Sequence, residues 1–111
     1  MEDCVFCKIV KKEIPAEIIY EDHDAVVFKN IEPVATHHLL IIPVKHVSNF
    51  LELNDEILTM TKITQKIIKD LNISDAYKLV FNGGKYQSIP HLHWHLLAGN
   101  LEPDKNLLNN L

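Results

Sequence analysis

The chain has 111 residues, which is enough for one domain and too few for two, and its composition is 47% hydrophobic and 23% charged, as in soluble globular proteins. We therefore expect a single domain over residues 1–111, with a loose tail from about residue 100. The formal net charge of -4 and the lack of arginine argue against a nucleic-acid partner, and no apolar run approaches the ~20 residues of a membrane span.

The first half of the chain reads as short strands. Residues 18–20 and 25–28 are β-branched and apolar runs separated by a polar turn, which predicts a hairpin. Residues 39–42 form a continuous apolar run between two prolines, typical of a central strand whose two faces are both covered.

The second half begins with one long helix. Over residues 55–71 apolar side chains recur every three or four positions, which predicts an amphipathic helix. Its apolar stripe consists of Ile57, Met60, Ile63, Ile67 and Leu71. Asn54 is placed to cap its start, and Asn72 to end it in a left-handed conformation.

Two more strands follow the helix. Residues 77–81 have strand character, residues 82–84 read as a turn, and residues 89–97 read as a further strand. This order of elements predicts an α+β domain, in which one long helix packs on an antiparallel-rich sheet.

The last predicted strand carries a row of histidines. His91, His93 and His95 alternate with apolar residues, and because side chains two apart on a strand share a face, the three imidazoles lie together. Buried imidazoles need partners, and no simple packing role calls for three in register.

Three interpretations of this row remain open. It is the polar face of an edge strand, or it holds a catalytic zinc ion in a metal hydrolase. In the third interpretation, which we favour, a neutral imidazole attacks phosphorus and forms a covalent intermediate that water hydrolyses. A histidine pKa near ~6.5 suits that role at physiological pH.

Cys4 and Cys7 are the only cysteines and are separated by two residues. Because the first residues do not resemble a secretory signal, we expect a cytoplasmic location, where this spacing favours a metal over a disulfide. Two of the seven histidines would complete a Cys2His2 zinc site, but spacing alone does not choose them. The alternatives are two buried thiols without metal or a redox pair; no strand precedes the cysteines to support the latter.

Residues 87–97 resemble the His-x-His-x-His hallmark of the histidine triad (HIT) superfamily, in particular its Hint branch. The likeness extends in order and spacing over residues 4–9, 13–16, 20–22 and 31–46. It implies a homodimeric protein that binds a purine nucleotide or nucleoside phosphoramidate across the triad strand and cleaves it at the α-phosphorus.

The resemblance also assigns catalytic roles. By position, His93 is the nucleophile, His95 lies beside the phosphate, and His38 completes the histidine set. Ser88 would hydrogen-bond the phosphate or the leaving group, although the residue is also ordinary at the end of a strand.

A nucleotide-binding set follows in the same way. Its members are Asn30, Ile31, Asn82, Gln87 and Ser88, together with the last two triad histidines. Ile31 would contact the purine and Asn82 the ribose and phosphate region, although a core residue and a turn residue would look the same. Asn30 stands where the family usually carries a carboxylate that holds the ribose hydroxyls, which leaves ribose discrimination open.

For the metal, zinc-bearing members of the branch use the positions of His46 and His91 together with the cysteine pair, Cys4 and Cys7. Such a four-ligand site would be structural, because it has no open position for water. It leaves His93 and His95 free for chemistry.

The leaving group and the acceptor are not determined by the sequence. A nucleotide-binding regulatory protein with weak catalysis remains an alternative, as does a dinucleoside polyphosphate hydrolase or a nucleotidyl transferase of the same superfamily.

Overall fold

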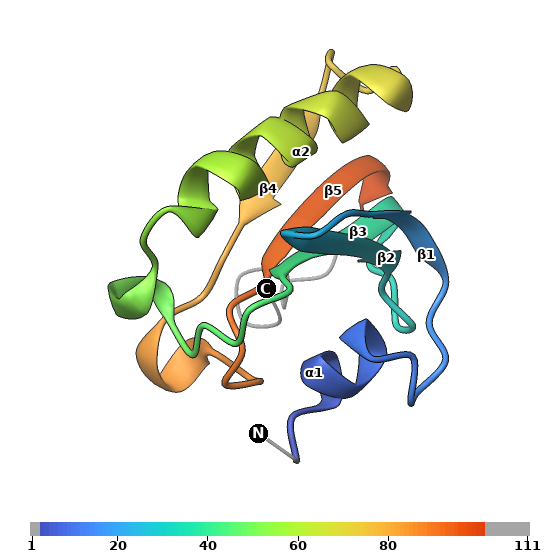
Figure 1. The fold of residues 1–111 in the computed structure, drawn as a ribbon. Coiled ribbons are helices and arrows are strands. Elements are labelled where there is room, and N and C mark those ends of the chain that lie inside the picture. The colour runs from blue at the N-terminus through green and yellow to red at the C-terminus, as the bar shows by residue number, and fades with distance from the viewer. Residues whose placement is uncertain (1–2, 102–111) are drawn as a thin grey trace.

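A computed structural model describes residues 3–101 as one sheet with helices on both faces (Figure 1). Five antiparallel strands stand in the order β1-β2-β3-β5-β4. The strands are β1 Ile18–Glu21, β2 Ala25–Lys29, β3 Ala35–Pro43, β4 Tyr77–Val80 and β5 Trp94–Leu101. The helices are α1 Val5–Val10 and α2 Glu56–Asp70, with the 3-10 turns η1 Phe50–Glu52 and η2 Gly84–Tyr86. The predicted α+β class is confirmed.

The sheet separates two apolar cores. In β2, Val27 packs on the α2 side and Val26 on the α1 side, and in β3 the same alternation separates Ile41 from Ile42. Residues 39–42 are therefore buried on both faces, as their continuous apolar run predicts. The hairpin predicted from residues 18–28 is present as β1 and β2.

Helix α2 matches its predicted range, but its start differs from the prediction. Asn54 does not cap the helix: its side-chain Nδ2 donates to the Glu52 carbonyl, and the cap position is Asp55, which makes no side-chain cap hydrogen bond. Ile57 is 44% exposed and does not join the buried stripe, because the first turn of the helix extends past the edge of the core. Asn72 ends the helix with φ 57°, in the predicted left-handed conformation.

The last strand is shifted from its predicted range. It runs from Trp94 to Leu101 rather than from residue 89 to residue 97: Pro90 has no N–H to donate to a neighbouring strand, and the pairing with β3 ends where Ile41 lies opposite Trp94. The segment before it bends at Pro90, where the His91 amide donates to the Ile89 carbonyl at 2.8 Å, and it is held by the Leu92 amide, which donates to the Val47 carbonyl at 2.7 Å. Alternation continues through this segment, so Leu92 packs in the α2-side core.

Helix α1 is an element that the sequence did not predict. Cys4 caps it by accepting a hydrogen bond from the Cys7 amide at 3.3 Å, and Phe6 and Ile9 bury its inner face. Apart from the end of β5, the tail expected from about residue 100 lies outside the described residues. Neither helix within residues 3–101 has the length and apolarity needed to cross a membrane.

Candidate active site and metal centre

The three histidines of the row face different surroundings. All three are buried on the α1 side of the sheet, yet only His93 and His95 line a cavity there. His91 instead points at the two cysteines. The row predicted from the sequence therefore divides between two sites.

His91 is fixed by a hydrogen bond at one ring nitrogen and turns the other toward the cysteines. Its Nε2 lies 2.9 Å from the Pro43 carbonyl, which can only accept, so Nε2 carries the proton and Nδ1 has a free lone pair. That Nδ1 lies 3.3 Å from the Cys4 Sγ and 3.5 Å from the Cys7 Sγ. Burial, aided by His46 and His93 nearby, lowers the pKa of His91 to about 4, so the ring is neutral and able to ligate.

Four ligand atoms gather at this point, from Cys4, Cys7, His46 and His91, all within 4.8 Å of one another. The Cys7 Sγ lies 3.2 Å from His46 Nδ1. In tetrahedral zinc sites, bond lengths of about 2.3 Å to sulfur and 2.05 Å to nitrogen separate neighbouring ligand atoms by about 3.5 Å. The cluster thus has the donor set and the spacing to hold a metal ion, and the Pro43 carbonyl supplies the outer hydrogen bond typical of a metal-bound histidine.

Without a metal, this cluster is a costly arrangement of buried polar groups. Burial and the neighbouring Cys4 raise the pKa of the Cys7 thiol, so the protein itself does not stabilise a thiolate there. A bound cation reverses this balance, because it stabilises the deprotonated sulfur directly.

The cavity beside His93 and His95 has a volume of about 370 Å³. Helix α1, the chain after β2 and the segment before β5 form its walls. Its polar lining includes Asn30, Ser88, His93 and His95. Its apolar lining includes Val5, Phe6, Ile9, Ile14, Ala16, Phe28, Ile31, Leu40 and Ile89. The cavity therefore offers both apolar surface and a set of imidazole, amide and hydroxyl groups.

His93 has one ring nitrogen occupied and one free. Its Nδ1 lies 2.9 Å from the His91 carbonyl oxygen, so Nδ1 carries the proton and Nε2 keeps its lone pair. The Phe6 ring packs edge-on at 5.1 Å between centroids and restrains the imidazole. Burial lowers the His93 pKa, which keeps the ring neutral near pH 7. A neutral, oriented imidazole with a free nitrogen is able to act as a nucleophile.

His38 and His95 form a second fixed pair. The Val34 amide donates to His38 Nδ1 at 3.1 Å, so the His38 proton lies on Nε2. That Nε2 donates to His95 Nδ1 at 2.9 Å and leaves the His95 proton on its own Nε2. Burial lowers the pKa of His38 to about 4. Burial, and repulsion from His93 and His38 when these rings are protonated, lower the pKa of His95 to about 3.

Asn30 joins this pair from the chain after β2. Its side-chain oxygen accepts from the Glu32 amide at 2.8 Å, and its side-chain nitrogen lies 3.2 Å from His38 Nε2. Ile31, next to it, is 90% exposed and lines the mouth of the cavity.

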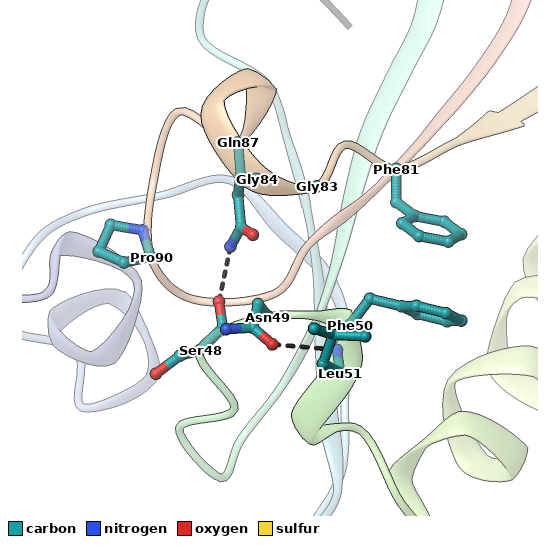
Figure 2. A pocket seen from close by; sticks show the side chains of 9 residues that line it. All are labelled: Ser48, Asn49, Phe50, Leu51, Phe81, Gly83, Gly84, Gln87 and Pro90. Carbon is teal, nitrogen blue, oxygen red and sulfur yellow. Dashed lines mark hydrogen bonds between the residues drawn. The ribbon is translucent and has the colours of Figure 1, made fainter.

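Two residues of the predicted nucleotide-binding set lie elsewhere. Gln87 lines a separate hollow, which has a volume of about 500 Å³. There its side-chain Nε2 donates to the Ser48 carbonyl at 2.6 Å (Figure 2). A second bond joins the same amide to the Ile89 carbonyl at 2.9 Å, so Gln87 holds the loop before the histidines. Asn82 lines neither the hollow nor the cavity of His93 and His95.

Sequence reasoning did not identify three groups that orient the histidines. The Pro43 and His91 carbonyls and the Val34 amide are main-chain atoms, so no residue type signals them. Phe6 was also missed, because the helix that carries it is only six residues long and too short for a periodic signal.

Comparison with known proteins shows what the chain is similar to. The HIT domain family matches residues 11–101. Protein HitA of Neisseria gonorrhoeae is 39% identical over 104 residues, which cover 88% of this chain and 97% of that protein. The adenosine 5'-monophosphoramidase HINT3 of Xenopus tropicalis is 38% identical over 102 residues, covering 86% of this chain and 67% of that one.

Solved structures agree with these relatives. A HIT family hydrolase from Clostridium thermocellum superposes with a TM-score of 0.85 at 40% identity, covering 96% of this chain and 99% of that one. A histidine triad protein from Clostridium difficile has the same TM-score of 0.85 at 32% identity, covering 94% of this chain and 96% of that one.

Proposed function

Because the chain belongs to the HIT domain family, we propose that it hydrolyses purine nucleoside phosphoramidates or related nucleotides at the α-phosphorus, through a covalent intermediate on His93. The observation that carries this proposal is the hydrogen bond from His93 Nδ1 to the His91 carbonyl. It leaves Nε2 as the nucleophilic atom of a buried, neutral imidazole that lines a cavity of nucleotide size.

The reaction has two steps. His93 Nε2 forms a bond to the α-phosphorus while the phosphorus–nitrogen bond of the substrate breaks, and the amine leaves with the electron pair and takes up a proton. Water then forms a phosphorus–oxygen bond, loses a proton, and releases the nucleoside monophosphate and the neutral imidazole.

Polar neighbours of His93 have supporting roles. The His95 Nε2–H is free to donate to a phosphate oxygen, because His38 occupies the other ring nitrogen. Such a donor stabilises the charge that develops on the phosphoryl oxygens. Ser88 lines the same cavity, and we assign its hydroxyl to the phosphate or the departing amine.

The rest of the nucleotide fits the apolar part of the cavity. Phe28, Leu40 and Ile9 offer flat or aliphatic surface to a base, and Ile31 at the mouth could cover it. Asn30 lines the same cavity and contacts His38, and we place the sugar beside it. In this placement Asn82 and Gln87 act at most through the loop before the histidines.

We assign structural zinc to the cluster of Cys4, Cys7, His46 and His91. Two thiolates and two imidazoles with no open position suit zinc, which would tie α1 and the segment after β3 to the chain before β5. A reducing cytoplasmic compartment would keep both thiols available as ligands. His93 and His95 line a different cavity, so a zinc hydrolase using all three triad histidines is disfavoured.

We also propose that the protein is a homodimer. Within residues 3–101, β4 pairs with β5 alone and leaves its other edge open; Tyr77 and Leu79 are exposed on this strand and Phe81 directly after it. The Phe81 ring stacks on the Phe50 ring (Figure 2), with 4.7 Å between the ring centroids, and this pair continues the apolar surface. Light scattering should give a dimer for the wild type and a monomer for Leu79→Lys; a monomeric wild type contradicts the assignment.

The experiment that tests the activity compares two histidine variants. His93→Ala should abolish turnover of adenosine phosphoramidate and still bind AMP, because the cavity keeps its other walls. His23→Ala is the matched control, since His23 is exposed in the β1–β2 turn, and should retain full turnover. Unchanged turnover in His93→Ala rules out the proposal. Tight AMP binding by a wild type that turns over no faster than His93→Ala would favour a nucleotide-binding regulatory protein.

A further inference from the structure

The side-chain amide of Asn30 has a defined orientation. Its Oδ1 accepts from the Glu32 amide at 2.8 Å, and a main-chain N–H can only donate, so the oxygen is the atom on that side. The main-chain N–H of Asn30 donates to the His38 carbonyl at 2.9 Å, which anchors the residue to β3. Nδ2 is therefore the atom turned toward the His38 ring.

The atom that Nδ2 meets cannot accept a hydrogen bond. The Val34 amide donates to His38 Nδ1, so the single proton of the neutral His38 lies on Nε2 and is donated to His95. The 3.2 Å approach of Asn30 Nδ2 to this Nε2 consequently places one donor against another. Within residues 3–101, no acceptor for the Asn30 Nδ2 protons is found.

This unsatisfied donor borders the cavity of His93 and His95. Asn30 contacts His38, which in turn contacts His95, the side chain that we assign to the phosphate, and its neighbour Ile31 contributes to the apolar lining. Of the three parts of a nucleotide, the sugar is the one that lies between phosphate and base. The sugar is thus the part that would meet the Asn30 N–H.

We infer that Asn30 is a specificity-determining residue that makes the site indifferent to the 2'-hydroxyl, so that ribonucleotides and 2'-deoxyribonucleotides bind alike. A donor is satisfied by either hydroxyl oxygen or by the ring oxygen, and removal of the 2'-hydroxyl leaves other acceptors in reach. A carboxylate at this position would need hydroxyl protons and would prefer a vicinal diol. The inference rests on the proposed nucleotide function and concerns the sugar alone.

The test measures the dissociation constants of AMP and 2'-deoxy-AMP by calorimetry. For the wild type the two constants should agree within about threefold, since no charge-assisted contact to the 2'-hydroxyl is lost. Asn30→Asp keeps an oxygen for the Glu32 amide and replaces the donor by an acceptor. This variant should bind 2'-deoxy-AMP more weakly than AMP by about tenfold or more, which corresponds to the loss of one hydrogen bond to a charged group.

Gln65→Glu is the matched control, because it adds the same charge on the exposed face of α2 and should leave the ratio of the two constants unchanged. A wild type that prefers AMP by more than tenfold overturns the inference and leaves the nucleotide function intact, as does an unchanged ratio in a folded Asn30→Asp. Failure of the folded wild type to bind either nucleotide overturns both. The wild-type ratio alone decides the inference if Asn30→Asp does not fold.

Discussion

Replacement of His38 by glutamine should make the protein less sensitive to acid. His38 is buried, and burial lowers its pKa from 6.5 to about 4 in the native state. In the unfolded chain its pKa returns to about 6.5. Between these two values the unfolded state therefore binds one proton more than the native state, and stability falls as the pH is lowered.

The size of the effect follows from this difference. One proton of difference changes the free energy of unfolding by about 1.4 kcal/mol per pH unit. Over the interval from 6.5 to about 4, His38 accounts for a loss on the order of 3 kcal/mol. In His38→Gln the side-chain amide can still donate to His95 Nδ1 and does not titrate, so this contribution disappears.

Urea unfolding followed by the fluorescence of Trp94, which is buried and the only tryptophan, measures the effect. Between about pH 4.5 and 6.5 the stability of His38→Gln should fall less steeply than that of the wild type, by about 1.4 kcal/mol per pH unit. Loss of metal and protonation of His91 and His93 affect both proteins and cancel in the comparison; His95, whose pKa is lowered to about 3, is protonated below this pH range. Parallel curves for the two proteins would refute a buried, neutral His38.

Two further predictions concern stability. A chelator should lower the free energy of unfolding of the wild type by several kcal/mol. It should have little effect on Cys7→Ser, in which a ligand is already missing. Equal effects on the two proteins in thermal melts would show that the cysteines hold no metal. Gly99→Ala should lower the free energy of unfolding by a few kcal/mol, because Gly99 has φ +85° and an added Cβ would lie 2.5 Å from the Thr36 Cβ. Gly83 has open space around it, so Gly83→Ala should change the stability by less than about 1 kcal/mol. Similar melting temperatures of the two variants would contradict this prediction.

Local patterns were sufficient to predict much of the fold. The period of apolar residues placed α2 to within a residue at each end, and the apolar run of residues 39–42 identified the second half of β3, which begins at Ala35. Both signals come from side chains that must be buried on known faces of regular elements. The class of the domain followed from the order of these elements.

The ends of the strands could not be predicted in this way. Pro90 is a local signal against a strand, but Leu92 and His93 alternate in the same way as residues 94–97 and still do not pair with β3, whose pairing with β5 ends at Ile41 opposite Trp94. The end of a strand depends on where its neighbour ends, and that is a tertiary property.

The candidate site was predicted by residue type but not by its connections. His91, His93 and His95 were identified from their alternation, and Cys4 and Cys7 from their spacing. The structure adds which atoms hold each ring, as in the bond between His38 and His95 over a separation of 57 residues. Such contacts leave no local pattern in the sequence, because the sheet brings the two strands together.

The central claim is that His93 Nε2 forms a covalent bond to the substrate phosphorus. The direct test is to mix the protein with adenosine phosphoramidate, quench at alkaline pH within the first turnover, and map the modified peptide by mass spectrometry. We predict an adenylyl group on His93 and none in His93→Ala. A group found on His95 or Ser88, or turnover without any adduct under conditions in which hydrolysis of the intermediate is rate-limiting, would contradict the account.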